Sequence, residues 1–504
     1  MIFMTEDAVK WIKNFSRKPL LDRKNIIELL SYGNYSLWWF LEWLMEGGRF
    51  HFLNINSILQ KPKQKNFQNK KDLYLKFSRI FIRKILWYPF IPFNNIKPKK
   101  RNVSFISTLN KKVYDNHKDD IVEDEVFLPI INILQDKYKD IGVFLIDIPY
   151  KKELGLRSYY KGIKRGINFV PLEQFMGVKE GFRAYKRYAY YKNVWAEIKR
   201  SGSLDFLDKD IKRHIINNFD FFFSIFLFII LWEIEGYKSI FRKCQIDILC
   251  TGDPFNLSGF KPRLAFKGKM LGIQPGFWGS PELEYIHSKA DLKTYPLIDY
   301  AAVWDKKTKI SIHKLTNIPI NKMIIVGNSR EDDISFKLKY YNIKLDKKKV
   351  LFLSLPFYDK KEFDIFLNEA FSFLKKIPQE EKIIRPHPNE KDSSIYQKFI
   401  DEYNIKNVHV SKGEDIIFPL SQAKFVVTGN STVVTEAILL KKPTVMLDVF
   451  NKGYSKFVNS VKSVRTSSDL LNCFNSIKKH DKQVNLRSRA YNNIAKLITK
   501  LIYA

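Results

Sequence analysis

Apolar and polar positions alternate in blocks along the chain from residue 101 onward. In the first of two series, apolar runs of strand length are separated by longer segments of helix length. These runs cover residues 102–107, 141–148, 245–251, 300–304 and 323–326. Short apolar runs between helix-length segments are typical of βαβ units, so this part of the chain predicts a mainly parallel sheet.

A second series of the same kind begins at residue 349. Strands are predicted at residues 349–355, 382–385, 408–410, 425–427 and 444–447. Helices are predicted at residues 363–375, 395–403, 416–421, 432–440, 468–478 and 485–501. Two such halves predict an α/β fold with two Rossmann-like domains that face a central cleft, where the ligand binds.

The domain boundaries follow from these two series and from the segments around them. The predicted N-terminal domain covers residues 1–335 and consists of a helical region at 1–100 and a Rossmann-like region at 101–335. A second Rossmann-like domain follows at 350–485, and a final helix is predicted at 486–504. In the helical region, residues 32–40 open an apolar helical stretch and residues 72–88 read as an amphipathic helix. Residues 331–349 are polar and lysine-rich, and we expect them to connect the domains.

Composition supports a folded protein in a reducing compartment. Hydrophobic residues make up 45% of the 504 positions, which is enough to bury a core and argues against disorder. The cysteines Cys244, Cys250 and Cys473 have no framework spacing, which indicates neither disulfides nor a structural metal. Residues 221–232 form the most apolar stretch, but a membrane span needs roughly 20 residues. A buried helix and a cytoplasmic protein are therefore expected.

The net charge of +33 favours an anionic partner. Positive potential attracts polyanions and anionic membrane surfaces, so the protein is expected to be soluble or peripheral on the inner face of the cell membrane. The basic runs at 61–71, 97–101 and 347–349 can equally be solvated loops. Nucleic acid is not favoured as a partner, because the sequence has no zinc-finger spacing and no RNA-binding consensus.

The first chemical motif is Arg385-Pro386-His387-Pro388, at the end of the strand predicted at 382–385. In open α/β sheets the carboxyl ends of the strands face the ligand crevice. The two prolines restrict the backbone around His387 and present it together with Arg385. Arginine suits phosphate, and histidine can donate a hydrogen bond or move a proton near neutral pH. A structural histidine is the alternative.

The second motif is Gly429-Asn430-Ser431-Thr432, which follows the strand predicted at 425–427. Gly429 permits a tight turn, and Ser431 or Thr432 can cap the next helix. Free N–H groups and small hydroxyls at such a position favour a phosphate-sized anion. Glu436 lies about one turn further on, where its carboxylate can accept hydrogen bonds from ribose hydroxyls. The alternative is a well-capped helix with an exposed glutamate.

Together the two motifs resemble a known family. Arg-Pro-His-Pro followed by Gly-Asn-Ser-Thr, and then by Glu-Ala and Lys-Lys-Pro-Thr-Val, resembles the C-terminal half of GT-B glycosyltransferases that assemble bacterial and archaeal surface polysaccharides. The pattern is similar to capsule-type Kdo transferases, polysialyltransferases and teichoic-acid glycerophosphotransferases, and UDP-N-acetylglucosamine 2-epimerases share the scaffold. The resemblance covers residues 350–449. It implies a GT-B-like fold in which His387, Ser431 and Thr432 hold the donor phosphate, with Arg385 assisting.

The acceptor side departs from this resemblance. Many relatives carry His-Gly where this chain has Gln274-Pro275-Gly276, which weakens the polyol-phosphotransferase alternative because that chemistry commonly uses the histidine. A carboxylate within hydrogen-bond reach of the acceptor hydroxyl would serve as the base. The candidates are Asp253, which can also be a plain turn residue, and Glu282 or Glu284.

Two further strand ends complete the set of candidates. Gln274 and Asn328 are expected to contact the donor, although the turn around Asn328 can be purely structural. No metal and no cofactor are expected, because backbone amides and basic side chains can stabilise the leaving phosphate.

The sequence therefore predicts an enzyme, a glycosyltransferase. Its donor would be a nucleotide-activated sugar, CMP-linked if the resemblance holds, and its acceptor a surface polysaccharide or a lipid-linked glycan of capsule or lipopolysaccharide biosynthesis. The alternatives are a CDP-polyol phosphotransferase, a UDP-sugar 2-epimerase-like enzyme and a non-catalytic scaffold that binds glycan or membrane.

Overall fold

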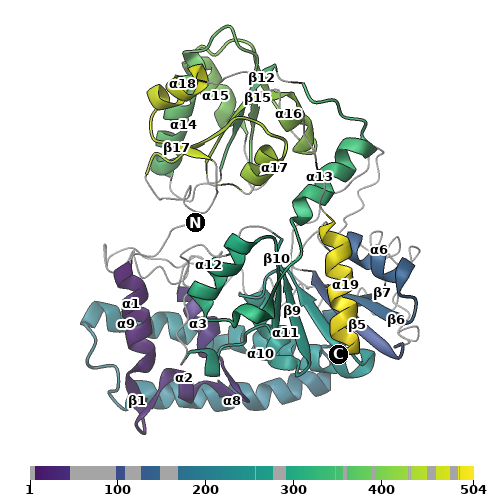
Figure 1. Cartoon of the computed structure of the whole chain (residues 1–504). Coiled ribbons are helices and arrows are strands. Elements are labelled where there is room, and N and C mark those ends of the chain that lie inside the picture. Colours follow the sequence, from purple (N-terminus) through teal and green to yellow (C-terminus); the bar gives the residue numbers. More distant parts are fainter. Residues whose placement is uncertain are drawn as a thin grey trace. The chain divides into compact units, whose positions relative to one another are not determined.

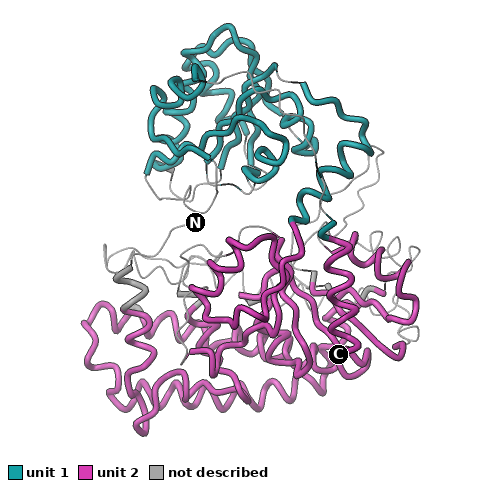
Figure 2. Tube along the Cα trace, viewed as in Figure 1, with its two compact units in different colours: residues 1–2, 328–490 teal, residues 3–327, 491–504 magenta. Residues whose placement is uncertain are grey.

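A computed structural model of the chain contains two compact units (Figure 2). Unit 1 comprises residues 1–2 and 328–490, and unit 2 comprises residues 3–327 and 491–504. The structure describes residues 6–45, 98–107, 127–147, 168–255, 257–275, 278, 291–346, 348–355, 360–387, 390, 393–411, 413–429, 431, 433–450, 461–476, 486 and 489–504. The amphipathic helix predicted at 72–88 lies outside these residues.

Within the described residues, unit 1 holds a parallel six-stranded sheet. Its strands are β12 (Lys349–Leu353), β13 (Lys382–Arg385), β14 (Val408–Val410), β15 (Ala423–Thr428), β16 (Thr444–Leu447) and β17 (Lys462–Val464). They lie in the order β14-β13-β12-β15-β16-β17, so the chain first builds the sheet in one direction from β12 and then crosses to its other side. The order reverses between β12 and β15, and ligands bind at such a switch point in open α/β sheets.

Helices cover both faces of this sheet (Figure 1). They are α13 (Ser329–Tyr340), α14 (Lys360–Lys375), α15 (Ser394–Glu402), α16 (Ile417–Gln422), α17 (Val433–Leu439) and α18 (Ser467–Asn475). Neighbouring residues of a strand point to opposite faces. Accordingly, Val350 and Phe352 of β12 pack with α14, α15 and α18, whereas Leu351 and Leu353 pack with α13, α16 and α17. Because β12 is covered on both faces, its sequence is a continuous apolar run.

Unit 2 holds a second parallel sheet, in which the chain also adds strands in one direction first and then crosses to the other side of its first strand. Its described strands are β5 (Arg101–Ser107), β6 (Ile141–Asp147), β7 (Asn168–Pro171), β8 (Ile248–Thr251), β9 (Lys269–Ile273), β10 (Tyr300–Val303) and β11 (Met323–Ile325). They lie in the order β11-β10-β9-β8-β5-β6-β7, which reverses between β5 and β8. The prediction of two Rossmann-like domains in an α/β fold is therefore confirmed.

The helices of unit 2 surround this sheet. The longer ones are α6 (Leu128–Lys137), α8 (Val178–Arg200), α9 (Lys209–Phe221), α10 (Leu227–Cys244), α11 (Leu257–Ala265), α12 (Lys306–Thr316) and α19 (Ala490–Tyr503), and the short turns are η2 (Leu172–Phe175), η3 (Phe222–Phe226), η5 (Asp291–Lys293) and η6 (Ile320–Lys322). The C-terminal helix α19 belongs to this unit because Ile494, Ile498 and Leu501 pack against strands β5 and β6.

An additional N-terminal region packs on unit 2. It consists of α1 (Glu6–Arg17), β1 (Pro19–Leu21), β2 (Lys24–Asn25), α2 (Ile26–Leu29), β3 (Ser31–Tyr32), β4 (Tyr35–Ser36) and α3 (Trp38–Met45). The helical stretch expected from residue 32 begins only at Trp38. Gly33 has a φ of 62° and turns the chain between β3 and β4, and this left-handed conformation interrupts a helix.

The apolar segment predicted as a buried helix lies in the core of unit 2. Residues 209–244 run through α9, the π-helical turn η3 and α10, and they are the one described stretch long and apolar enough to cross a membrane. Leu227, Ile230 and Ile234 are at most 3% exposed and pack with residues of α3 and α8, and Tyr237 packs beneath the sheet. Within the predicted stretch 221–232 the prediction of burial is confirmed for Leu227 and Ile230, whereas Phe228 and Trp232 are only partly buried.

The connecting segment expected at 331–349 is largely helical. Residues 329–340 form α13, which begins at the N-cap Asn328. Ile334 is buried against the unit 1 sheet, and Lys337 pairs with Asp333 at 2.8 Å and with Asp415 at 3.1 Å. The segment expected to connect the domains is therefore part of unit 1, and the expectation of no core pattern after Phe336 was wrong, because Leu338, Ile343 and Leu345 are partly buried against the same core.

Candidate functional site

The two motifs singled out in the sequence lie side by side at one edge of the unit 1 sheet. Leu353, the last residue of β12, pairs with Arg385 of β13 on one side and with Thr428 of β15 on the other. The Ser354 N–H donates to the Arg385 carbonyl at 3.0 Å, which continues the pairing past the end of the strand. The residues that follow β12, β13 and β15 therefore meet at the switch point of this sheet.

His387 is held by a glutamate that follows it. The backbone N–H of His387 donates to Glu390 Oε1 at 2.9 Å, and the Glu390 N–H donates to the His387 carbonyl at 2.9 Å. The hydroxyl of Tyr396 donates to Glu390 Oε2 and shares a second hydrogen bond with Ser354 Oγ. Thus a chain of hydrogen bonds joins the end of β12, helix α15 and the turn that carries His387.

Burial defines the electrostatics of this hydrogen-bonded chain. Burial raises the pKa of Glu390, while the hydrogen bonds from Tyr396 and from the His387 N–H lower it in part. Burial also raises the pKa of the Tyr396 hydroxyl, and the neighbouring Glu390 raises it further. Tyr396 is fully buried and remains a protonated donor at neutral pH, so it fixes the orientation of the carboxylate.

Arg385 faces the loop after β14. Its Nη1 donates to Ser411 Oγ at 2.9 Å, and its Nη2 donates to the Glu414 carbonyl. Burial lowers its pKa, but the nearby carboxylates of Glu414 and Asp415 counteract this, and arginine stays charged in proteins. Arg385 thus ties two loops together at the edge of the switch point, and its contribution to phosphate binding stays a prediction.

Gly429 allows close packing at the end of β15. A Cβ atom at this position would lie 2.1 Å from Leu355 Cδ1 and 3.4 Å from a ring carbon of Phe366. The chain bends at Gly429 as expected, but its backbone is not left-handed, so the bend by itself does not require a glycine. Instead, the absence of a side chain lets the strand end approach the residue after β12.

Ser431 starts the helix that follows. Its Oγ accepts a hydrogen bond from the Val433 N–H at 3.4 Å, and its carbonyl accepts one from the Val434 N–H at 3.2 Å. The capping role expected for Ser431 is therefore present. Asn430 and Thr432, the other members of this motif, lie outside the described residues, as does Pro388.

Glu436 is a buried carboxylate, and one of its oxygens has no hydrogen-bond partner within the described residues. Its side chain is on α17, is 7% exposed, and places Oε1 3.5 Å from Arg330 Nη1. Within the described residues, Oε2 has no hydrogen-bond partner, and neither has Thr428 Oγ1 at the end of β15. Burial raises the pKa of Glu436, and Arg330 lowers it in part. The exposed glutamate that the sequence analysis kept as an alternative is wrong.

The candidates of unit 2 lie at the ends of its own strands. Asp253 follows β8 at the switch point between β5 and β8, and its N–H donates to Thr251 Oγ1 at 3.3 Å. Gln274 is buried after β9, where its Oε1 accepts from the Trp304 N–H at 2.8 Å and its carbonyl accepts from Trp304 Nε1 at 3.0 Å. Gln274 therefore joins the ends of β9 and β10, and donor contact by this residue stays a prediction.

Asn328 lies where the chain passes from one unit to the other. Its Oδ1 accepts the Arg330 N–H at 2.9 Å and so caps α13, and the preceding Gly327 has a φ of 97°. This supports the structural alternative for the turn around Asn328 without testing the donor contact. Glu282 and Glu284 lie outside the described residues.

Sequence reasoning assigned no role to several residues of this site. Glu390 is part of the segment that carried the first motif, but its partner Tyr396 is on a helix and Ser354 on another strand end. Arg330 belongs to a turn already singled out, yet its pairing with Glu436 depends on how α13 packs against α17. Contacts between separate elements leave no local pattern in the sequence. Among the described residues, no group of three or more His, Cys, Asp or Glu could hold a metal ion.

Comparisons with known proteins concern the fold. No family model and no curated protein matches the sequence. Among solved structures, the UDP-GlcNAc 2-epimerase from Neisseria meningitidis bound to UDP-GlcNAc covers 80% of this chain and 99% of its own, with 14% identity and a TM-score of 0.49. MurG from Acinetobacter baumannii covers 79% and 99%, with 10% identity and a TM-score of 0.44.

A third structure is similar over a larger part of the chain. The wall teichoic acid polymerase TagF covers 86% of this chain and 99% of its own, with 12% identity and a TM-score of 0.41. These TM-scores are below 0.5, so the similarities support no conclusion about function. The structure itself has the α/β fold with two Rossmann-like units and the additional N-terminal region expected from the sequence, whereas a GT-B-like arrangement of the units around a central cleft stays a prediction.

Proposed function

We propose that this protein is a metal-independent glycosyltransferase that uses a nucleotide-activated sugar, CMP-linked in our preferred version, as its donor. The donor binds unit 1 at the switch point between β12 and β15. The acceptor is a surface polysaccharide or a lipid-linked glycan of the cell envelope, such as capsule or lipopolysaccharide, and the reaction takes place in the cytoplasm.

One observation carries the proposal: the unpartnered, buried oxygen of Glu436. A buried polar atom without a hydrogen bond costs about 1–3 kcal/mol, so native proteins rarely keep one without a reason. A carboxylate oxygen accepts two hydrogen bonds, which matches the vicinal hydroxyls of a ribose. Thr428 Oγ1, also unpartnered among the described residues, lies at the end of β15, the strand that precedes α17 in the chain. Both atoms would gain partners when a nucleotide binds.

The remaining roles follow from the position of each residue. In this proposal His387, presented by the Glu390–Tyr396 hydrogen bonds, holds the donor phosphates together with Ser431 and Thr432, and Arg385 assists. Gly429 and Asn430 belong to the same donor-binding motif. Hydrogen-bond donors aimed at the leaving phosphate stabilise the charge that develops there. In this proposal Asp253 or Glu284 takes the proton from the acceptor hydroxyl, which requires hydrogen-bond reach to it.

Replacing His387 tests the catalytic part of the proposal. In cells that depend on this gene for a surface glycan, His387→Ala should lower glycan production by about a hundredfold or more, the usual loss when a donor to a developing charge is removed. The matched control is His409→Ala, an exposed histidine on β14 of the same unit. Unchanged glycan with His387→Ala at normal protein level would contradict a catalytic role and favour a binding scaffold.

A further inference from the structure

Helix α8 of unit 2 has one face in the core and one face in solvent. Ala184, Tyr191, Trp195 and Ile198 are at most 3% exposed and belong to the hydrophobic core that α3 and α10 complete. The inner face therefore has its partners within the chain. Any role of the outer face must involve something else.

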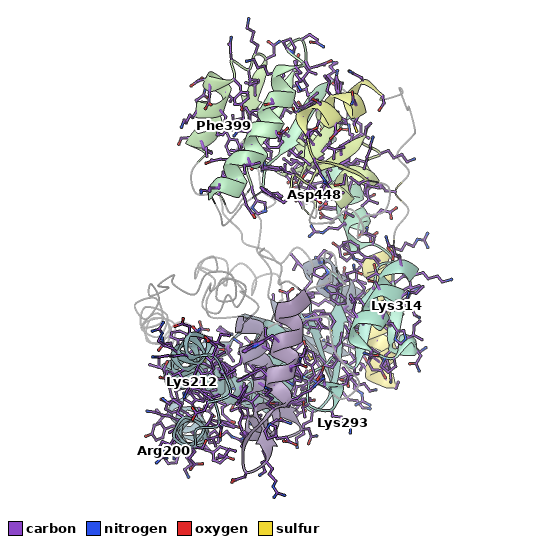
Figure 3. The ribbon with its side chains drawn as sticks, turned by 90° about the vertical axis from the view of Figure 1, so that its left-hand side faces the viewer. Arg200, Lys212, Lys293, Lys314, Phe399 and Asp448 are labelled. Carbon is purple, nitrogen blue, oxygen red and sulfur yellow. The ribbon has the colours of Figure 1, made fainter. Side chains whose placement is uncertain are left out.

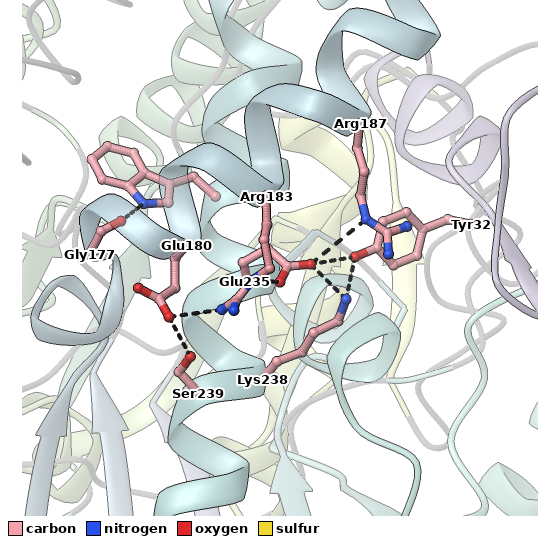
Figure 4. Close-up of polar contacts among 9 residues, drawn as sticks. Tyr32, Gly177, Glu180, Arg183, Arg187, Glu235, Lys238 and Ser239 are labelled. Atoms are coloured by element: carbon pink, nitrogen blue, oxygen red, sulfur yellow. Dashed lines mark hydrogen bonds and ion pairs between the residues drawn. The ribbon is translucent and has the colours of Figure 1, made fainter.

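Polar contacts fix this orientation of α8 (Figure 4). Arg183 donates to Glu180 Oε1 at 2.8 Å and to Glu235 Oε2 of α10 at 3.0 Å. Lys238 Nζ donates to Glu235 Oε1 at 2.7 Å, and Trp232 Nε1 donates to the Gly177 carbonyl just before α8 at 3.1 Å. Glu235 is only 3% exposed, and two of these bonds, from Arg183 to Glu235 and from Trp232 to the Gly177 carbonyl, join α8 and the residue before it to α10.

The outer face carries a row of large apolar side chains. Val178 is 89% exposed, Phe182 is 60% exposed and Tyr185 is 57% exposed. They are four and three residues apart, so they are neighbours along one side of the helix. We call these three residues the α8 row. Large apolar side chains gathered on an exposed face mark an interaction site more often than scattered ones do.

Lysines flank the α8 row. Lys179, Lys186 and Lys192 are exposed, and Lys186 Nζ lies 4.7 Å from the centre of the Phe182 ring. The only acidic residue between positions 178 and 192 is Glu180, which is already paired with Arg183 and Ser239. Further along the surface of unit 2, the exposed Arg200 adds positive charge, whereas Lys212 is paired with Asp205 (Figure 3). The face is apolar at its centre and cationic around it.

We propose that the α8 row docks on the surface of an anionic lipid bilayer. An aromatic and apolar row with lysines around it is the pattern of helices that lie in the membrane interface, where aromatic side chains enter the headgroup boundary and lysines meet anionic lipid. A soluble polyanion would pair with the lysines but offer nothing to Val178 and Phe182. The net charge of +33 supports the same partner. The proposal goes beyond sugar transfer and does not depend on it.

Flotation of the purified full-length protein with lipid vesicles tests whether the α8 row docks on an anionic bilayer. The protein should bind phosphatidylcholine vesicles that contain phosphatidylglycerol, and bind pure phosphatidylcholine vesicles much less. Lys179→Glu combined with Lys186→Glu should weaken binding about thirtyfold or more, since each cation near such a surface contributes about 1 kcal/mol and each new anion opposes it. Phe182→Ser combined with Tyr185→Ser should weaken it by roughly tenfold.

Matched variants control for general charge and general hydrophobicity. Lys306→Glu with Lys398→Glu makes the same change of net charge at other exposed positions. Phe336→Ser with Tyr340→Ser removes two side chains that are 57% and 59% exposed on α13. Both control proteins should bind vesicles like the wild type, and all four variants should keep the wild-type circular dichroism spectrum.

Four outcomes would overturn the proposal. The first is a wild-type protein that does not bind anionic vesicles, and the second is an equal loss of binding in the control variants. The third is binding to soluble dextran sulfate without binding to vesicles. The fourth is a wild-type protein that does not bind vesicles but forms a dimer, with the dimer lost when Phe182 and Tyr185 are both replaced by serine. The last would assign the α8 row to a second copy of the chain. Because no nucleotide is present, none of these results bears on the proposed transferase reaction.

Discussion

Burial determines the chemistry of Glu436. A carboxylate in water is ionised at neutral pH, but this one is almost fully enclosed, and enclosure raises its pKa. Arg330 at 3.5 Å compensates only one of its oxygens. The protein therefore keeps a group in unit 1 that lowers its stability, as expected where a ligand supplies the missing hydrogen bonds.

Replacing Glu436 with glutamine should stabilise the protein at neutral pH. Because the folded pKa is raised above 4.5, the stability linked to this group is full below pH 4.5 and is lost as the pH rises through the folded pKa. Glu436→Gln removes the titration, so its free energy of unfolding should exceed that of the wild type by roughly 1 kcal/mol at neutral pH. Urea unfolding at several pH values measures this.

Measuring the free energy of unfolding of both proteins at several pH values checks that the difference comes from the titration of Glu436. The gap between Glu436→Gln and the wild type should close below pH 4.5. The control Glu402→Gln changes an exposed glutamate on α15 and should stay within about 0.5 kcal/mol of the wild type. A Glu436→Gln protein that is less stable than the wild type at neutral pH would show that Arg330 compensates the carboxylate fully.

At the scale of elements, the hydrogen bonds of Tyr396 hold the site together, since they join helix α15 to the end of β12 and to the turn after β13. Tyr396→Phe leaves the Glu390 carboxylate without its buried donor, which should lower the free energy of unfolding by about 1–3 kcal/mol. The matched control is Tyr403→Phe, which removes an exposed hydrogen bond to Asn368 Oδ1. Equal effects of the two substitutions in urea unfolding would contradict this role for Tyr396.

The same scale shows what the sequence could and could not predict. Strands β13, β14 and β16 have the bounds predicted for them, because short apolar runs between turn residues are read locally. The strands β7 and β17 were missed, although they are three or four residues long like these three. Helix α13 was taken for a linker, because its anchoring depends on Asp415 and on a sheet face far away in the sequence.

The same limit applies to the candidate site: residues next to a strand end can be found from the sequence, but contacts between separate elements cannot. His387 and Ser431 were found because they follow strands directly, whereas the partners of Glu436 and Glu390 come from separate elements. Gly429 was predicted for a turn, but its close approach to Leu355 could not be predicted. Packing between elements decides such contacts, and a single sequence carries no record of packing.

At the scale of the whole molecule, two sheets of the same strand order carry different chemistry. The carboxyl ends of the unit 1 strands gather hydrogen-bonding groups and an unpartnered carboxylate, while Gln274 and Trp304 close the ends of β9 and β10 in unit 2. The charge of +33 attracts an anionic nucleotide to either unit, so charge alone does not identify the donor site. In our proposal the position of Glu436 identifies it.

Isothermal titration of the wild type, Glu436→Gln and Glu402→Gln with CMP, CDP, UDP and GDP tests the central claim most directly. At least one nucleotide should bind the wild type and Glu402→Gln equally, and should bind Glu436→Gln about tenfold or more weakly, because hydrogen bonds to a charged group contribute about 1.5–3 kcal/mol. Preference for CMP would favour the CMP-linked donor. Binding of none of the four, or binding that Glu436→Gln leaves unchanged, would contradict the donor site proposed for unit 1.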